Sequence, residues 1–143
     1  MRFMMIMLPG EQAEKGVMPD QKLFAAMMKY NEDLQKAGVL ITLEGLHPSS
    51  KGARVSFPGG RPRVTPGPFT GAKDLVGGFW LIQVSSREEA ISWASRCPVV
   101  REEVIEIRQV YEASDFPAEA FPAELRERER ALSEELQRKT VKA

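Results

Sequence analysis

The sequence predicts an α+β fold, a ferredoxin-like βαββαβ domain with an inserted hairpin, followed by a C-terminal helix. Two observations support this prediction. Four apolar segments have the length and composition of strands, and two segments with helical periodicity separate the first from the second and the third from the fourth. The expected strands are residues 2–8, 39–46, 77–85 and 102–112. The order strand, helix, strand, strand, helix, strand is that of the split βαβ arrangement.

The first strand and the first helix have clear end signals. The run RFMMIML at 2–8 is apolar after Arg2 and closed by Pro9, which is typical of a buried central strand. Asp20 stands where an N-cap is expected, and Gly38 ends the helix because glycine adopts the left-handed conformation without strain. The spacing predicts one buried helix face, formed by Leu23, Phe24, Met27, Met28, Asn31 and Leu34.

The second half of the domain also has clear turn and helix-cap signals. Apolar and polar residues alternate over 53–57, and Pro58-Gly59-Gly60 predicts a turn into a return strand at 61–64, an edge strand because it contains Pro62. Ser86 and Glu89 form a capping box that opens the second helix, and Pro98 stops it. The buried side of that helix is predicted to carry Ala90, Ile91 and Ala94. The spacing does not decide whether Trp93 belongs to this side.

The predicted arrangement leaves one face of the sheet uncovered. Both helices of a split βαβ domain pack on the same side of an antiparallel sheet. Large apolar residues on the opposite side would need a partner, and a second copy of the chain is the simplest one. We therefore expect a homodimer that packs sheet to sheet.

The end of the chain is predicted to be separate from the domain. We place the domain at residues 1–116 and a linker with a charged helix at 117–143, the helix running from Pro122 to about Lys139. Three acid-first pairs at i,i+4 spacing support it, each worth roughly 0.2–0.5 kcal/mol. The helix either lies solvated against its own domain or the dimer mate, or docks another protein. The three pairs are Glu124 with Arg128, Glu134 with Arg138 and Glu135 with Lys139.

Composition excludes several classes of function. Twenty basic residues balance twenty acidic ones, so nucleic-acid binding is not expected. The single cysteine, Cys97, cannot form an internal disulfide and is expected in the core. The apolar start is shorter than the roughly 7–15 residues of an export signal, and no run approaches the ~18 apolar residues of a membrane span. We expect a cytoplasmic protein without membrane association, with no metal site and no cofactor, because zinc-ligand spacings and phosphate-loop motifs are missing.

Charge is unevenly distributed in the middle of the chain. Between Glu44 and Asp74 there is no acidic residue, although this span contains five cations and the only histidine. Such a group could hold a carboxylate or a phosphate. Alternatively, these cations pair with acids from elsewhere or protect a sheet edge from aggregation. The five cations are Lys51, Arg54, Arg61, Arg63 and Lys73.

His47 is the candidate general base, because imidazole titrates near neutral pH. Glu44 is the candidate acceptor that would orient it, although three residues along a strand or loop do not ensure contact. The alternative is a hydrogen-bonding surface histidine. A nucleophilic role for Ser49 or Ser50 is less supported, because no strand–turn–helix elbow surrounds them.

The stretches EGLHPSSKGARVSF, PGGRPRVTPGPFTGAKDLVGGFWLIQVSSREEAISWASRCP and EIRQVYEASDF resemble the YCII-related proteins, in particular the subgroup named for an Asp-Gly-Pro-Phe motif. The resemblance implies a ferredoxin-like fold in the dimeric α/β-barrel superfamily. It also implies a link to transcriptional regulation, because members of this subgroup are often encoded beside sigma factors. Two positions depart from the family pattern. Pro66 replaces the motif aspartate, and Met27 stands near the place of a family histidine. The family-pattern residues that remain are Glu44, His47, Ser49, Ser50, Lys51, Arg54 and Lys73.

Two functions follow as hypotheses, and whether the protein is an enzyme is left open. The first is a site for a small anionic molecule between sheet and hairpin, with His47 as base and Arg54 and Lys73 as anion anchors, joined by Ser49, Ser50 and Lys51. The alternative is a non-catalytic dimeric interaction module linked to transcriptional regulation, which binds a sigma factor or another protein through its C-terminal helix.

Overall fold

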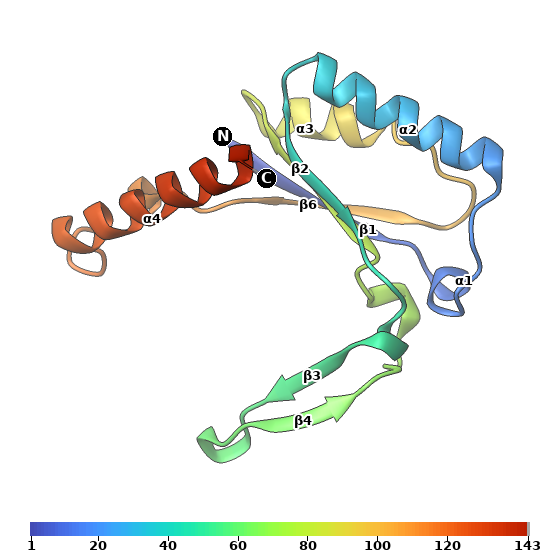
Figure 1. Cartoon of the computed structure of the whole chain (residues 1–143), viewed down its shortest axis with the longest axis horizontal. Coiled ribbons are helices and arrows are strands. Elements are labelled where there is room, and N and C mark those ends of the chain that lie inside the picture. The colour runs from blue at the N-terminus through green and yellow to red at the C-terminus, as the bar shows by residue number, and fades with distance from the viewer. Residues whose placement is uncertain (143) are drawn as a thin grey trace. The chain divides into compact units, whose positions relative to one another are not determined.

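The computed structural model describes residues 1–142 of the chain (Figure 1). The chain forms two compact units, Met1–Val110 and Tyr111–Ala143. The first unit contains a four-stranded sheet and a separate two-stranded hairpin. The second unit contains a short 3-10 turn and a long helix.

The main sheet has the strand order β2-β5-β1-β6, and each neighbouring pair is antiparallel. The most apolar strand, β1, lies between β5 and β6, as expected for a run with few polar residues. The predicted α+β, ferredoxin-like order is confirmed. The strands are β1 (Arg2–Leu8), β2 (Leu40–Gly45), β5 (Gly78–Gln83) and β6 (Val104–Gln109).

Two helices, α2 (Gln21–Lys36) and α3 (Arg87–Ala94), cover one face of this sheet (Figure 1). The predicted caps are present: an Asp20 carboxylate oxygen accepts from the Leu23 N–H at 2.8 Å, and Gly38 has φ +71° just beyond α2. Ser86 Oγ accepts from the Glu89 N–H at 3.1 Å. The Glu89 carboxylate accepts from the Ser85 N–H rather than from that of Ser86, so the reciprocal half of the capping box is shifted by one residue.

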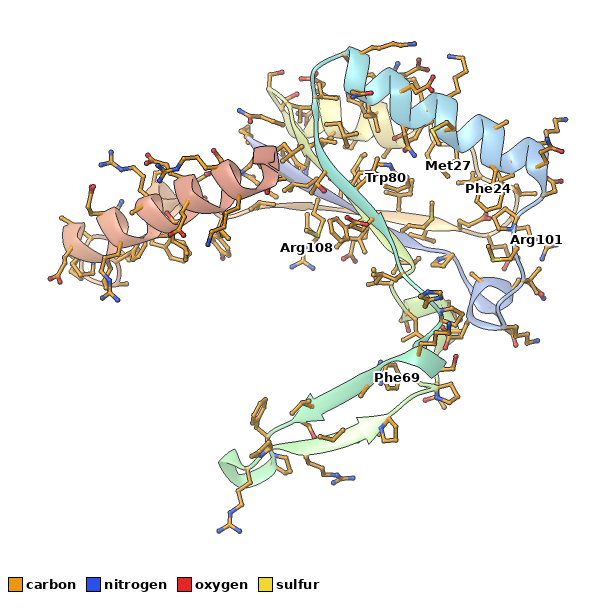
Figure 2. All side chains as sticks on the ribbon, viewed as in Figure 1. Phe24, Met27, Phe69, Trp80, Arg101 and Arg108 are labelled. Carbon is orange, nitrogen blue, oxygen red and sulfur yellow. The ribbon has the colours of Figure 1, made fainter. Side chains whose placement is uncertain are left out.

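The core lies between this helical layer and the sheet. Phe3 and Met5 from β1 and Ile82 from β5 are almost fully buried and meet Leu34 of α2. Figure 2 shows Trp80 and Met27 pointing into the same layer. Each large apolar side chain buried in this way contributes about 1.5–3 kcal/mol.

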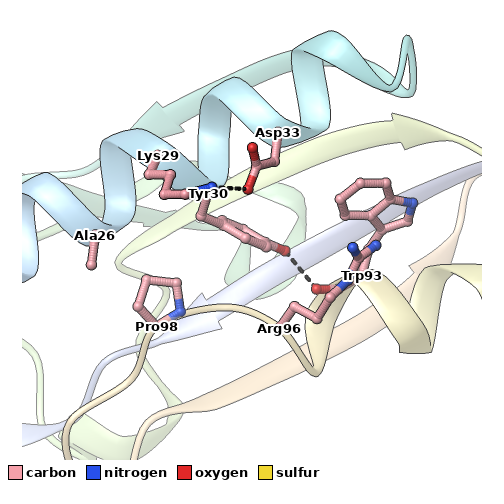
Figure 3. Close-up of a pocket in the computed structure, with 7 residues that line it drawn as sticks. All are labelled: Ala26, Lys29, Tyr30, Asp33, Trp93, Arg96 and Pro98. Carbon is pink, nitrogen blue, oxygen red and sulfur yellow. Dashed lines mark hydrogen bonds and ion pairs between the residues drawn. The ribbon is translucent and has the colours of Figure 1, made fainter.

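The buried face of α2 differs from the predicted one. Phe24 and Met28 are 52% and 60% exposed, whereas Tyr30, which the apolar pattern omitted, is 5% exposed. A tyrosine can be buried here because its hydroxyl donates to the Trp93 carbonyl oxygen at 2.9 Å (Figure 3). In α3, Trp93 is buried and Ile91 is largely exposed, so the prediction was wrong for Ile91 as well.

The inserted hairpin consists of β3 (Ala53–Ser56) and β4 (Arg63–Pro66), joined through a 3-10 turn at Pro58–Gly60. The return strand starts two residues later than predicted, so Pro62 precedes it instead of lying within it. Every residue of both strands is exposed. The hairpin leaves the sheet on the side away from α2 and α3 (Figure 1).

The sheet face opposite the helices has an apolar centre and polar sides. Two cross-strand rows define it, and the central residues of both rows are partly exposed. Figure 2 shows Arg108 on this side of the sheet. We call this surface the open face. Its rows are Thr42–Leu81–Met4–Arg108 and Glu44–Phe79–Ile6–Glu106.

The second unit begins with an aromatic cluster and continues into α4 (Ala123–Lys142). Phe116 packs between Tyr111 and Phe121, with ring centroids 4.9 and 5.8 Å away. Arg126 donates to the carbonyl oxygens of Phe116 and Phe121, which ties the start of α4 to this cluster.

Along α4 the structure gives one of the predicted ion pairs, Glu135 with Lys139 at 2.8 Å. Leu132 and Leu136 are more than half exposed, and the docking role of this helix stays a prediction. Over residues 1–142, every helix is too short or too polar to cross a lipid bilayer.

Candidate functional site

A pocket of about 450 Å³ lies at the base of the hairpin, where three short elements meet. These are α1 (Glu11–Glu14), the 3-10 turn Ser49–Lys51 and the 3-10 turn Ala72–Asp74. Its volume is within the ~300–1,000 Å³ range of small-molecule sites. The pocket has a polar set and an apolar set of side chains. The polar set is Glu14, His47, Ser49, Lys51, Arg54 and Asp74, and the apolar set is Leu46, Pro48, Phe69, Leu75 and Val76.

Ser49 connects three segments that are distant in sequence. Its backbone N–H donates to both carboxylate oxygens of Glu14, at 3.1 and 3.2 Å, and its hydroxyl donates to the same carboxylate. The Phe69 N–H donates to Ser49 Oγ at 2.8 Å. Because a backbone N–H can only donate, the hydroxyl proton must point toward Glu14. Ser49 thereby holds the motif Pro66-Gly67-Pro68-Phe69 against α1.

Gly67 permits this close approach. A Cβ at this position would lie 2.6 Å from the carbonyl carbon of Ser49 and 3.2 Å from the nitrogen of Ser50. Both are backbone atoms, which cannot rotate away as a side chain can. The Gly67 N–H donates to the Gly52 carbonyl oxygen at 3.0 Å and closes the base of the hairpin. The peptide bond between Gly67 and Pro68 is cis.

Two cations line the pocket without an acidic partner. Neither Lys51 nor Arg54 forms an ion pair with any residue in the described part of the chain. The guanidinium carbon of Arg54 lies 4.0 Å from the centre of the Phe69 ring, a cation–π contact that orients the side chain. Its planar fork of N–H donors matches a carboxylate.

Two acids and the histidine complete the polar set. Glu14 is engaged by Ser49, whereas the side chains of His47 and Asp74 have no hydrogen-bond partner among the described residues. The formal charges of Lys51 and Arg54 balance those of Glu14 and Asp74 when the histidine is neutral.

The backbone of the pocket has few free donors. Most N–H groups of the lining residues already donate to carbonyl or side-chain oxygens of the chain. A ligand must therefore be bound chiefly by side chains. The N–H groups engaged in this way are those of Glu14, Leu46, Ser49, Lys51, Gly52, Phe69, Asp74 and Leu75.

The structure brings four of the predicted site residues together: His47, Ser49, Lys51 and Arg54. Three others lie outside the pocket lining. Glu44 faces Phe79 across the open face, Ser50 is exposed on the 3-10 turn, and Lys73 is exposed beside Asp74.

Sequence reasoning did not identify Glu14 or Phe69 as site residues. Glu14 lies 35 residues before Ser49, and no local pattern links the two. Phe69 was visible only as part of the family motif.

A second cavity of about 170 Å³ lies between α2 and the end of α3 (Figure 3). Lys29 and Asp33 form an ion pair beside it at 3.0 Å, and the Arg96 guanidinium stacks 3.7 Å from the Trp93 ring. Burial raises the pKa of Tyr30 well above its usual value, so the phenol remains protonated. The charged groups around this second cavity have partners, which indicates that these residues pack the domain and do not bind a ligand.

The remaining candidates for chemistry are the single cysteine and a metal site. Cys97 is 7% exposed, which confirms its predicted place in the core, and burial raises the pKa of its thiol to about 11. A thiol with that pKa is a poor nucleophile at neutral pH. Among residues 1–142, no three His, Cys, Asp or Glu side chains lie close enough together to hold a metal ion.

The sheet order, the two helices on one face and the polar pocket beside an inserted hairpin define a ferredoxin-like α+β domain with a candidate small-molecule site. The family model for the YCII-related domain matches residues 1–114, and the chain belongs to this family. No curated protein matches the chain. The finer assignment to the Asp-Gly-Pro-Phe subgroup stays a prediction.

Proposed function

We propose that the pocket at the hairpin base binds a small anionic molecule. The observation behind this proposal is that Lys51 and Arg54 line the pocket without an acidic partner among the described residues. Of the two carboxylates in the lining, Glu14 and Asp74, Glu14 accepts hydrogen bonds from Ser49. An incoming anion can therefore form charge-assisted hydrogen bonds without first breaking an ion pair.

His47 has a place in this proposal as a group that can donate to a bound anion when protonated. No second residue orients the imidazole within the described chain, because Glu44 lies on the open face. Binding is therefore better supported than general-base catalysis.

The only histidine of the chain gives a direct test of this function. We expect its imidazole NMR signals to shift saturably when acetate or inorganic phosphate is added at constant ionic strength. Arg54→Ala should weaken binding at least about tenfold, because a charge-assisted hydrogen bond contributes roughly 1.5–3 kcal/mol.

Arg63→Ala is the matched control, because Arg63 lies on the same hairpin but outside the pocket. It should retain the affinity of the unaltered protein. Equal loss in both variants would point to non-specific attraction by the basic hairpin and would contradict the proposed site.

A different observation favours a second function, assembly through the open face. Ile6, Met4, Phe79 and Leu81 form an apolar centre that remains partly exposed in the single chain. We propose that a second copy of the chain covers this face, because apolar surface of this kind is stabilised by removal from water.

Ile6→Asp should disrupt that assembly. We expect analytical ultracentrifugation to show a dimer for the unaltered chain and a dissociation constant at least about 100-fold higher for the variant, because an unpaired carboxylate buried at an interface costs several kcal/mol. The matched control is Ile91→Asp on the exposed side of α3, which should remain dimeric. A monomeric unaltered chain at about 100 μM, or dissociation by both variants, would refute this assignment.

A further inference from the structure

We infer that the ligand of the hairpin-base pocket is a monocarboxylate attached to an apolar body of about the size of one ring, such as an aromatic monocarboxylic acid. This inference rests on the proposed anion site and specifies its ligand class. Three independent features of the pocket support it: its charge balance, its small number of free backbone donors and its apolar lining residues.

The charge balance disfavours a doubly negative ligand. Lys51 and Arg54 are offset by Glu14 and Asp74, so the lining side chains have no net formal charge when His47 is neutral. A monoanion can be matched by the guanidinium. A dianion would bring a second negative charge toward these two carboxylates, which would repel it.

The donor geometry disfavours a phosphate group. Phosphate sites commonly use several backbone N–H groups from a turn or a helix N-terminus. Here the N–H groups of Ser49, Lys51 and Phe69 are already engaged within the chain. The main free donors are the guanidinium of Arg54 and the ammonium of Lys51, and the guanidinium fork suits the two oxygens of a carboxylate.

The apolar side chains of the pocket explain why the ligand should have an apolar body in addition to its carboxylate. Leu46 and Val76 are 53% and 46% exposed although they line the pocket, and Phe69 lies beside the Arg54 guanidinium. A small polar anion would leave these surfaces in water. A ring attached to the carboxylate would cover them, at about 25 cal/mol for each Å² of apolar surface removed from water.

Four probes test the inference on the full chain: benzoate, acetate, benzyl alcohol and inorganic phosphate, each titrated at pH 7 while the His47 signals are followed. We expect benzoate to bind at least tenfold more tightly than acetate, phosphate or benzyl alcohol. Leu46→Ser should reduce benzoate affinity several-fold and leave acetate affinity unchanged, because only the apolar contact is removed.

The outcomes separate this inference from the function on which it rests. Phosphate or acetate binding as tightly as benzoate would overturn the ligand class and leave the anion site in place. Benzyl alcohol binding as tightly as benzoate would overturn both, because the charge would then contribute nothing. Failure of all four probes to shift His47 would overturn the anion site itself.

Discussion

Gly67→Ala should open the base of the hairpin and abolish ligand binding. The added methyl group would overlap backbone atoms of Ser49, which cannot rotate away as a side chain can. We expect a loss of about 3 kcal/mol in the free energy of unfolding, in the upper part of the range for overpacked sites. Urea denaturation measures this change.

A local opening would give a second readout. The Phe69 N–H is bonded to Ser49 Oγ, so its hydrogen exchange should accelerate when the motif separates from the turn. Gly45→Ala is the matched control, since a Cβ there meets nothing within 4 Å and the glycine has no positive φ. Unchanged stability, exchange and binding in Gly67→Ala would show that the close approach does not organise the pocket.

Leu34→Ala should destabilise the first unit by about 2–5 kcal/mol, because it leaves a cavity in a core that cannot collapse around it. Leu34 is fully buried, between α2 and the sheet. Urea or thermal unfolding followed by circular dichroism measures this loss.

The control for Leu34 lies on the same helix. Met28 is 60% exposed, so Met28→Ala should change the free energy of unfolding by no more than about 0.5 kcal/mol. Equal destabilisation by both substitutions would mean that the face of α2 with Phe24 and Met28 is buried, as the apolar spacing alone predicted.

The faces of the helices show where a pattern is insufficient. In α2, apolar residues stand in adjacent pairs at 23–24 and 27–28, so the spacing fits more than one helix face. The choice depends on Tyr30, whose hydroxyl needs the Trp93 carbonyl, 63 residues later, before it can be buried. A partner at that separation has no local signal in the sequence.

The candidate site was also predicted only in part from the sequence. The proximity of His47, Ser49 and Lys51 follows from their place in one short segment. Glu14 and Phe69 join them only through hydrogen bonds that span 35 and 20 residues, and Lys73 is left out because the turn that contains it presents Asp74 to the pocket instead.

The sequence by itself determined the order of strands and helices, the caps at Asp20 and Ser86, and the charge imbalance of the central segment. These depend on hydrophobic period and on backbone groups within a few residues, which neighbouring side chains satisfy locally. The tertiary structure alone decided that Ser49 meets Glu14 and Phe69, and that Glu44 faces away from the histidine it was expected to orient. Such contacts depend on how whole elements pack, because burial and hydrogen bonding across the fold select among faces and turns that the local pattern leaves equivalent.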